Sequence, residues 1–209
     1  MKQEAATTMT KGRLIVFSAP SGCGKGTMLE EILKNKGFRT AVSATTRNPR
    51  EGEINGISYH FLSREDFDRK IDNNEFLEHA EYCGNCYGTL KSEVDPYLEQ
   101  GTDVILEIEV QGAMKIRAIR PDALFIFIAP PSVRELRRRL KKRGTESDDV
   151  IEERVSKASG EIALAGNYDY VIVNDALEDA VSDFFKVVRA EKLKSEYSGE
   201  LIDKILNEV

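Results

Sequence analysis

The sequence has few cysteines, few histidines and no long apolar run. Its three cysteines are an odd number, and the first residues do not read as a leader, so we expect a reducing, cytoplasmic location and no disulfide framework. The longest apolar run, Ala123 to Ala129, is far short of the ~18 to 20 residues that cross a bilayer. The only histidines, His60 and His79, form no Ser/His/Asp pattern. These absences argue against a secreted disulfide scaffold, a membrane-spanning chain and a catalytic triad.

The charge of the chain is acidic overall but unevenly placed. Thirty Lys and Arg against 36 Asp and Glu give a net charge of −6, which argues against a general nucleic-acid binder. The segment Arg134 to Arg143, RELRRRLKKR, nevertheless holds seven cationic residues and one acidic residue. Positive charge concentrated in this way indicates a local use for it. With 41% hydrophobic and 32% charged residues, the chain otherwise has the composition of an ordinary globular protein.

Short apolar runs alternate with helical patterns along the chain. Buried strands are expected at Leu14–Phe17, Val104–Ile108, Ala123–Ile128 and Tyr170–Val173. Helices are expected at Lys25–Lys36, Ser92–Gln100, Val110–Ile119, Val133–Arg143, Asp148–Ala165 and Leu177–Lys194. This alternation predicts an α/β fold, in which a parallel sheet is covered by helices on both faces.

Two segments interrupt the alternation and are expected to be inserts. Residues 43–89 are rich in Gly, Asn, Tyr and Glu, and a helix within them begins at the cap Ser63 to Asp66. The arginine-rich run and the acidic segment Thr145 to Asp149 form a second, helical insert. We expect one domain over residues 1–209, with a core of about 12–42, 90–133 and 166–194, inserts at about 43–89 and 134–165, and a helical tail at 195–209.

The segment Ser18 to Thr27, SAPSGCGKGT, lies between a predicted strand and a predicted helix. A glycine-rich turn in that position presents backbone N–H groups to phosphate oxygens, and Lys25 adds a charge that can reach the β and γ phosphates. The pattern departs from GxxxxGK[ST], because Ala19 replaces the first glycine and Gly26 displaces the hydroxyl to Thr27. Its context favours a nucleoside triphosphate site over a plain turn and leaves the Mg²⁺ ligand open.

A second loop, Ser43 to Glu53, carries Arg47 and Arg50 on either side of a proline turn. Guanidinium groups match phosphate oxygens two at a time, so this loop favours a second anionic group. Taken alone, the loop is equally consistent with a solvated surface turn.

Together the two loops resemble those of the guanylate kinase family, which transfers the γ-phosphoryl group of ATP to GMP and so serves guanine nucleotide biosynthesis and GMP recycling. Further motifs extend the resemblance from Leu14 to about Lys194, in family order: FLEHAEYCGNCYGT, LEIEVQG, APPS, RRRLKKRGTES and YDYVIVND. The resemblance implies a P-loop NTPase-type sheet, a GMP-binding insert at 43–89 and a helical lid at 134–165. It also implies ADP and GDP as products and Mg²⁺ as the cofactor that accompanies ATP.

The resemblance places the ATP phosphates on a continuous loop of residues, namely Ala19, Pro20, Ser21, Gly22, Cys23, Gly24, Lys25, Gly26 and Thr27. Asn174 matches a residue that contacts the adenine or ribose. Arg139 and Arg143, one helical turn apart, and Arg154 match lid arginines, which with Lys25 are the implied catalytic residues. Such arginines are worth ~10³ to 10⁵ in rate in related reactions. The other cations of the run are expected to face solvent: Arg134, Arg137, Arg138, Lys141 and Lys142.

Most of the implied ligands of GMP come from the first insert, and Glu107 and Glu109 of the core are the others. The resemblance assigns the phosphate of GMP to Ser43, Arg47, Arg50, Tyr59 and Tyr87, with Glu53 in the same loop, and it assigns the guanine base to Glu78 and Thr89. A carboxylate can accept from the N1–H and 2-amino groups of guanine, and a hydroxyl can donate to O6, whereas adenine has no N1–H and carries an amino group at position 6. Mismatched buried polar groups can discriminate by ~10⁴ to 10⁵.

Two acidic residues, Glu107 and Glu109, alternate at the end of the predicted strand Val104–Ile108. Alternate strand positions face one way, so both carboxylates are expected at the C-terminal edge of the sheet. The resemblance places Glu109 near the guanine or ribose. It places Glu107 near Mg²⁺, bound through water, with Thr27 as the other possible ligand.

Three further functions are consistent with parts of the sequence. One is a kinase for a different nucleoside monophosphate, and another is a scaffold module like the guanylate-kinase-like domains that bind peptides. A third is a metal or redox site at Cys83 and Cys86 near His79, although one CxxC and one histidine supply too few ligands for a closed zinc site and packing is expected for Cys86. Cys23 is expected to make the protein sensitive to thiol reagents. The expected partners are small molecules, without nucleic acid or membrane, and the oligomeric state is left open.

Overall fold

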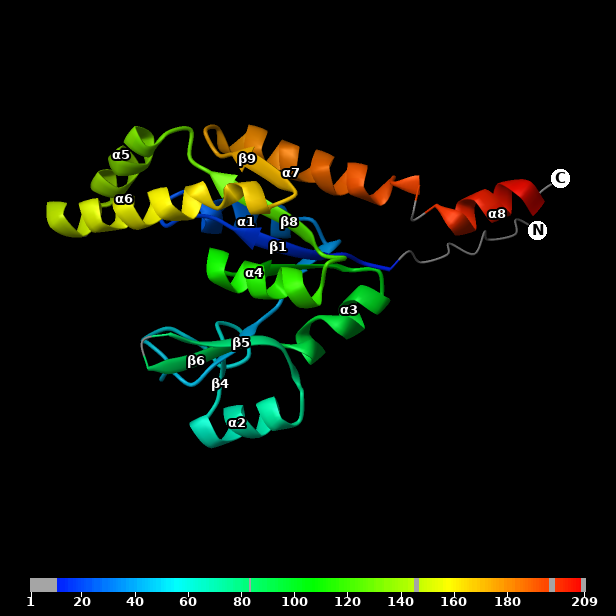
Figure 1. The fold of residues 1–209 in the computed structure, drawn as a ribbon, viewed down its shortest axis with the longest axis horizontal. Helices are drawn as coiled ribbons and strands as arrows, with labels where there is room; N and C mark the ends of the chain where they lie inside the picture. Colours follow the sequence, from blue (N-terminus) through cyan, green and yellow to red (C-terminus); the bar gives the residue numbers. More distant parts are fainter. Residues whose placement is uncertain (1–10, 83, 145–146, 196–197, 208–209) are drawn as a thin grey trace.

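A five-stranded parallel sheet forms the centre of the computed structural model, which describes residues 11–82, 84–144, 147–195 and 198–207. Its strands are β1 (Leu14–Ser18), β2 (Phe38–Thr40), β7 (Asp103–Glu107), β8 (Leu124–Ala129) and β9 (Tyr170–Val173), in the order β2-β7-β1-β8-β9. Figure 1 labels β1, β8 and β9 of this sheet. Four of them are the predicted strands. The fifth, β2, has only three half-buried residues, FRT, and so carries no apolar run that would mark it.

Helices cover both faces of this sheet, as the α/β prediction requires. In β1, Leu14 and Val16 face a cluster with α3 (Asp95–Glu99) and α4 (Val110–Ile119), whereas Ile15 and Phe17 face α1 (Lys25–Leu33) and α7 (Leu177–Lys192). All five β1 side chains are buried, because a central parallel strand packs on both sides. The sheet therefore holds the C-terminal ends of β1 and β7 side by side, where the next loops begin.

The helix predicted at Ser92–Gln100 is divided in two. A short 3₁₀ turn, η1 (Lys91–Glu93), precedes α3, and Val94 lies between them. Pro96 has no N–H to donate to the preceding turn, so a continuous α-helix cannot pass through it.

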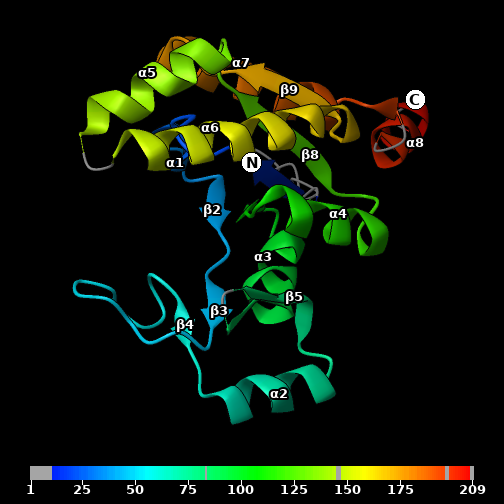
Figure 2. The same ribbon diagram turned by 60° about the vertical axis from the view of Figure 1, so that its left-hand side comes forward.

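The insert at residues 43–89 forms a second sheet beside the core. Its strands are β3 (Ser43–Thr45), β4 (His60–Phe61), β5 (Phe76–Tyr82) and β6 (Asn85–Leu90), in the order β4-β3-β6-β5 (Figure 2). Helix α2 (Arg64–Asp72) begins at the predicted cap, where the Ser63 hydroxyl accepts from the Asp66 N–H at 3.0 Å. The rings of Phe67 and Phe76 stack at 4.4 Å between centroids and join α2 to the sheet.

The segment predicted to be a lid, residues 134–165, contains a pair of helices, α5 (Val133–Arg143) and α6 (Asp148–Ala163), followed by the turn η2 (Ala165–Asn167). Leu136 and Leu140 of α5 pack against Ile151 and Val155 of α6, and the same cluster contains Cys23. The lid therefore shares its apolar core with the loop that follows β1.

A last helix, α8 (Gly199–Asn207), projects from the end of α7 (Figure 1). Its apolar side chains Leu201, Ile202, Ile205 and Leu206 are exposed. In the part of the chain that the structure describes, no helix combines the length and apolar character needed to span a membrane.

Candidate active site

The phosphate loop, Ser18 to Thr27, connects β1 to α1 through two glycines in the left-handed region. Gly22 and Gly24 have φ of 90° and 80°. A Cβ at Gly22 would lie 2.8 Å from Leu140 Cδ2, and one at Gly24 would lie 2.7 Å from Asn174 Nδ2. Both positions therefore require glycine, for backbone conformation and for space. The loop leads directly into the N-terminus of α1 at Lys25, where the helix dipole favours an anion.

Lys25 and Glu107 meet at the C-terminal edge of the sheet. The Lys25 Nζ lies 3.4 Å from Glu107 Oε1, because Glu107 ends β7, the strand next to β1. The alternation predicted that Glu109 also lies on that strand. The structure contradicts this, because Glu109 is the N-cap of α4. Its carboxylate lies 4.0 Å from Lys157 Nζ on α6. The chain leaves the sheet after Glu107, so the two carboxylates contact different lysines.

A carboxylate that sequence reasoning missed also reaches the phosphate loop. Glu161 of α6 hydrogen-bonds the backbone N–H of Ser21, and burial raises the pKa of Glu161 although Lys157 and Lys25 lower it. A single glutamate near the end of an amphipathic helix has no distinctive spacing, so the sequence carried no signal for this contact.

The thiol of Cys23 is fully buried. Burial raises the pKa of Cys23 to about 12, against the lowering effect of Arg139 and Lys25. Because reaction requires an accessible thiolate, both properties argue against the expected sensitivity to thiol reagents at this residue. Cys86 is buried among Ala44, Phe67 and Phe76, in agreement with the packing role that the sequence predicted for it. Cys83 lies outside the described residues, which contain no group of three or more candidate metal ligands.

Asn174 follows β9 and connects the lid to the phosphate loop. Its buried side chain donates from Nδ2 to the Cys23 carbonyl at 2.7 Å. Its own carbonyl accepts from Arg139 Nη1 at 2.8 Å. The amide therefore supports the loop in this structure, and its predicted contact with adenine or ribose stays a prediction.

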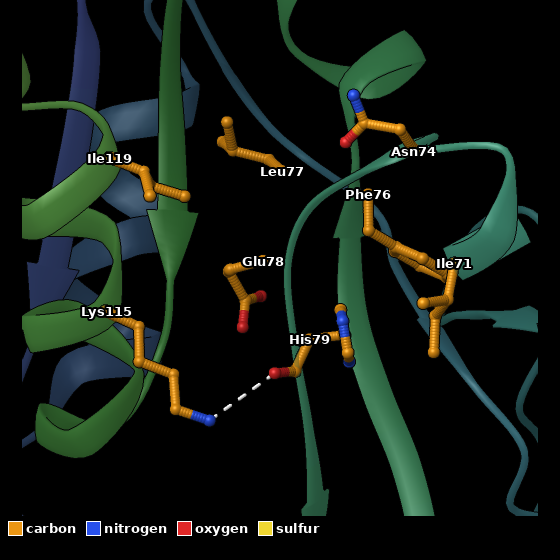
Figure 3. A pocket seen from close by; sticks show the side chains of 8 residues that line it. All are labelled: Ile71, Asn74, Phe76, Leu77, Glu78, His79, Lys115 and Ile119. Carbon is orange, nitrogen blue, oxygen red and sulfur yellow. Dashed lines mark hydrogen bonds between the residues drawn. The ribbon is translucent and has the colours of Figure 1, made fainter. Parts of the chain in front are cut away.

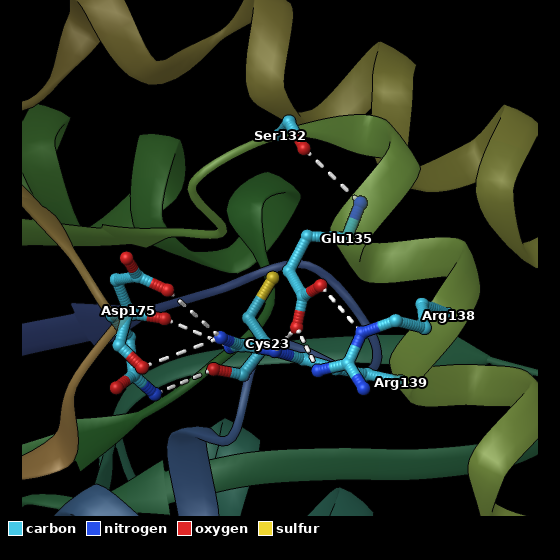
Figure 4. Close-up of polar contacts among 7 residues, drawn as sticks. Cys23, Ser132, Glu135, Arg138, Arg139 and Asp175 are labelled. Carbon is cyan, nitrogen blue, oxygen red and sulfur yellow. Dashed lines mark hydrogen bonds and ion pairs between the residues drawn. The ribbon is translucent and has the colours of Figure 1, made fainter.

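Arg139 is held by a carboxylate on its own helix. Glu135 accepts from Arg139 Nε at 2.9 Å and from Arg138 at 2.7 Å (Figure 4). Arg138 and Arg139 lower the pKa of Glu135 to about 2. Sequence reasoning did not single out Glu135, although two spacings pointed to it. Glu135 lies three residues after Ser132, whose side chain accepts from the Glu135 N–H at 3.1 Å, and four residues before Arg139.

The remaining cations of the basic run mostly connect the two lid helices or face solvent. Arg137 binds Glu152 at 2.7 and 2.9 Å, and Lys141 Nζ lies 2.8 Å from Asp148 Oδ1. The sequence predicted that five of these cations face solvent. Four of them are exposed, namely Arg134, Arg138, Lys141 and Lys142, whereas Arg137 is half-buried. The side chain of Arg143 lies outside the described residues, and Arg154 is half-buried on α6.

The Arg47 loop is organised by Glu53. One carboxylate oxygen of Glu53 accepts from Arg47 Nη2 at 2.8 Å, and the other accepts from the backbone N–H of Arg50 at 2.7 Å. The Arg47 guanidinium carbon lies 5.5 Å from the ring centroid of Tyr59, and the Tyr59 and Tyr87 rings are 6.3 Å apart. Four predicted ligands of the acceptor phosphate therefore lie close together, with Glu53 as the residue that shapes the loop.

The strand register places three predicted GMP ligands, Ser43, Thr89 and Glu78, in one row across the insert sheet. Ser43 lies opposite Thr89 across β3 and β6, and Glu78 lies opposite Thr89 across β5 and β6. The Thr89 hydroxyl donates to Glu78 Oε1 at 2.9 Å. Burial raises the pKa of Glu78, although the Thr89 hydrogen bond and Lys115 lower it. A partly desolvated carboxylate is thus held on the edge strand β5 of the insert sheet, beside β6.

Glu78 also lines a cavity of about 300 Å³ between β5, α2 and α4. Figure 3 shows its carboxylate pointing into this space toward Lys115 of α4, whose ammonium lies 3.4 Å from the His79 carbonyl. Ile71, Phe76, Leu77 and Ile119 supply the apolar walls. Lys115, which the sequence did not single out, brings a cation from the core to the insert.

A phosphate loop after the first strand of a parallel sheet, with a helical lid packed on that loop, is the architecture of the P-loop kinases. The chain matches the family model described as guanylate kinase over residues 11–191. It is 50% identical over 186 residues to the guanylate kinase of Clostridium tetani, covering 89% of each chain, and 48% identical over 198 residues to that of Bacillus subtilis, covering 94% of this chain and 97% of the relative. The crystal structure of guanylate kinase from Anaplasma phagocytophilum superposes with a TM-score of 0.70 at 35% identity, over 89% of each chain. The chain belongs to the guanylate kinase family.

Proposed function

We propose that the phosphate loop, the lid and the insert sheet form the site at which this guanylate kinase transfers the γ-phosphoryl group of ATP to GMP, giving ADP and GDP. The observation that carries the proposal is the alignment of Ser43, Thr89 and Glu78 on one sheet of the insert, with Glu78 and Thr89 in contact at 2.9 Å. This arrangement offers guanine an acceptor for N1–H and the 2-amino group and a hydroxyl for O6. The domain boundaries follow the same division into core, insert at 43–89, lid at 134–165 and tail.

The phosphate loop is the proposed site for ATP. Backbone N–H groups from Ala19 to Thr27 and the positive end of α1 would surround the β and γ phosphates, and Lys25 would bind their oxygens in place of its contact with Glu107 at 3.4 Å. Asn174 would act by holding the loop through the Cys23 carbonyl at 2.7 Å, besides any contact with the nucleoside.

The residues beside Lys25 fit Mg²⁺, the cation that normally accompanies ATP. Thr27 is exposed on the first turn of α1 and Glu107 is exposed at the end of β7, so hard oxygen donors flank the place proposed for the phosphates. We propose that Thr27, or Glu107 through water, holds the cation there, where it would neutralise phosphate charge. Their small number agrees with a site completed by waters and phosphate oxygens.

The reaction needs little help from a general base. The phosphate of GMP has a second pKa of ~6 and is largely ionised near neutral pH, so it can attack as it stands. Positioning and charge neutralisation then supply most of the rate. Arg47, Arg50, Tyr59, Tyr87 and Ser43 would fix the acceptor phosphate.

On the donor side, Arg139 would exchange the Asn174 carbonyl, now at 2.8 Å, for the transferred phosphoryl group. Glu135 would keep the guanidinium group of Arg139 oriented through its contact with Arg139 Nε at 2.9 Å. We propose the same phosphoryl-binding role for Arg143 and Arg154. Glu109, near Lys157, is proposed to serve the ribose side of the acceptor. We further propose that the reaction takes place in the cytoplasm.

A product assay with ATP and each of GMP, AMP, CMP and UMP tests this proposal. We expect ADP and GDP with GMP, loss of turnover in Lys25→Ala, and a loss of GMP affinity or rate in Arg47→Ala. Unchanged activity in both variants would refute the site assignment, and equal turnover with AMP would refute the reading of the base. A folded protein that consumes no ATP with GMP present would favour a peptide-binding module.

A further inference from the structure

Two stretches of chain connect the core to the insert. The first runs from β2 through Ala41 and Val42 to β3, and the second runs from β6 through η1 to α3 (Figure 2). Any movement of the insert relative to the core must act on these two connections. A side chain that joins them would therefore determine where the acceptor site lies.

Glu93, at the end of η1, joins the two connections. Its Oε2 accepts from Arg39 Nη2 at 2.7 Å and from the backbone N–H of Val42 at 3.4 Å, and its Oε1 lies 3.0 Å from His60 Nε2. The side chain is only 17% exposed. One carboxylate thus contacts the core strand β2 at Arg39, the first connection at Val42 and strand β4 of the insert at His60.

Arg39 attaches this cluster to the core. It lies on β2, where it is paired with Val104 of β7, and its guanidinium carbon stacks 3.3 Å from the ring centroid of Tyr97 on α3. A guanidinium held between an aromatic ring and a carboxylate has little freedom to move. Glu93 is therefore fixed on the core side, and its contact with His60 extends that order into the insert.

The groups that Glu93 contacts are the immediate neighbours of two proposed GMP ligands. Val42 directly precedes Ser43, and His60 directly follows Tyr59. We propose that Glu93 is a positioning residue for the acceptor phosphate, which fixes Ser43 and Tyr59 relative to the core through Val42 and His60. The inference rests on the proposed function, since it assumes that GMP binds at these residues.

The chemistry of the cluster calls for a carboxylate at this position. A carboxylate offers two oxygens that accept hydrogen bonds, which suits a cation, a backbone N–H and an imidazole at once. The amide of Gln keeps one acceptor oxygen only, so Glu93→Gln loses part of the cluster with little change in volume. His60→Phe removes the insert side alone and leaves the contact between Arg39 and Glu93.

Michaelis constants for GMP and ATP in these two variants test the proposal. We expect the GMP constant to rise about tenfold in Glu93→Gln and to rise less in His60→Phe, while the ATP constant stays within about twofold in both. The double variant should be no worse than Glu93→Gln alone, because the two changes remove the same contact. Glu75→Gln is the matched control: like Glu93, Glu75 accepts from a cationic side chain, here Lys70 of the insert at 2.6 Å, and the substitution should leave both constants unchanged.

A GMP constant within about twofold of wild type in both variants would overturn the proposal, as would an equal rise in the ATP constant, which would indicate a general loss of structure. Failure of the proposed function looks different, because the wild-type protein would then show no turnover with GMP.

Discussion

Thr89 donates its only hydroxyl hydrogen to Glu78, at 2.9 Å, across the neighbouring strands β6 and β5. That hydrogen cannot be donated to guanine O6 at the same time. In the proposed complex with GMP, the hydroxyl therefore rotates away from Glu78, and the carboxylate accepts from N1–H and the 2-amino group instead. Without the nucleotide, the two residues proposed to read the base hydrogen-bond each other.

The ionisation of Glu78 predicts an acid loss of GMP affinity. Burial raises the pKa of Glu78 above its ordinary value of 4.5, and only the ionised carboxylate has both oxygens free to accept from the two proposed guanine donors at once. The Michaelis constant for GMP should therefore rise as the pH falls through this raised pKa, over a window above 4.5. The same shift means that protonation of Glu78 favours the folded state, so the effect is not acid unfolding at this residue.

The measurement is the GMP constant from about pH 5 to pH 8 in the wild type and in Glu78→Gln. The phosphate of GMP, with a second pKa of ~6, titrates in both proteins, so only the difference between the two profiles belongs to Glu78. Identical profiles would contradict the assignment of this carboxylate to the base.

Arg139 and Arg137 lie on one helix and should differ sharply in function. Arg139→Ala should lower kcat by ~10³ or more, because the arginine is proposed to reach the transferred phosphoryl group. Arg137→Ala removes a partly exposed pair with Glu152 at 2.7 Å, so we expect kcat within about twofold and little change in stability. Steady-state kinetics and urea unfolding measure both, and equal losses of kcat would show that the basic run acts only through its total charge.

Asn174→Ala should weaken the phosphate loop. The substitution leaves the Cys23 carbonyl, now bonded at 2.7 Å, without this donor in a buried place, which costs ~1 to 3 kcal/mol of unfolding free energy. The Michaelis constant for ATP should rise and that for GMP should change little, because the contact supports the phosphate loop, the proposed ATP site, and not the insert. Urea unfolding with both constants checks this, and a stable variant with an unchanged ATP constant would show that the contact does not support the loop.

Cys23 should resist alkylation in the folded protein. With a pKa of about 12 and a buried side chain, its thiolate is scarce near neutral pH. Mass spectrometry of peptides after iodoacetamide treatment should find Cys23 unmodified in the native protein and modified in denaturant. Rapid native labelling of Cys23 would mean that the phosphate loop opens far more often than its packing against Leu136 and Leu140 indicates.

Local patterns were sufficient to predict most of the fold. The apolar runs that became β1, β7, β8 and β9 are long and continuous enough to mark buried strands. Strand β2 was missed because three half-buried residues carry no periodicity. Glu109 was misplaced because the alternation of apolar and acidic residues continues past Glu107, where the chain already leaves the sheet for α4.

Within the candidate site, the sequence could single out residues that lie inside a motif, but not residues that contact the site from other elements. Glu161, Lys115 and Glu93 lie in ordinary helix or turn positions, and only packing brings them to the phosphate loop, to Glu78 and to the connections of the insert. The buried contact between Asn174 and Cys23 joins residues 151 positions apart, a distance over which no local spacing rule applies.

The selectivity of the wild type and of Glu78→Gln for GMP over AMP, as the ratio of their kcat/KM values, tests the central claim most directly. The contact between Glu78 and Thr89 predicts a wild-type ratio of ~10⁴ or more, and a fall of at least ~10²-fold in the variant, because the amide cannot accept from both guanine donors. A ratio that is unchanged by the substitution would contradict the claim that this cluster reads guanine.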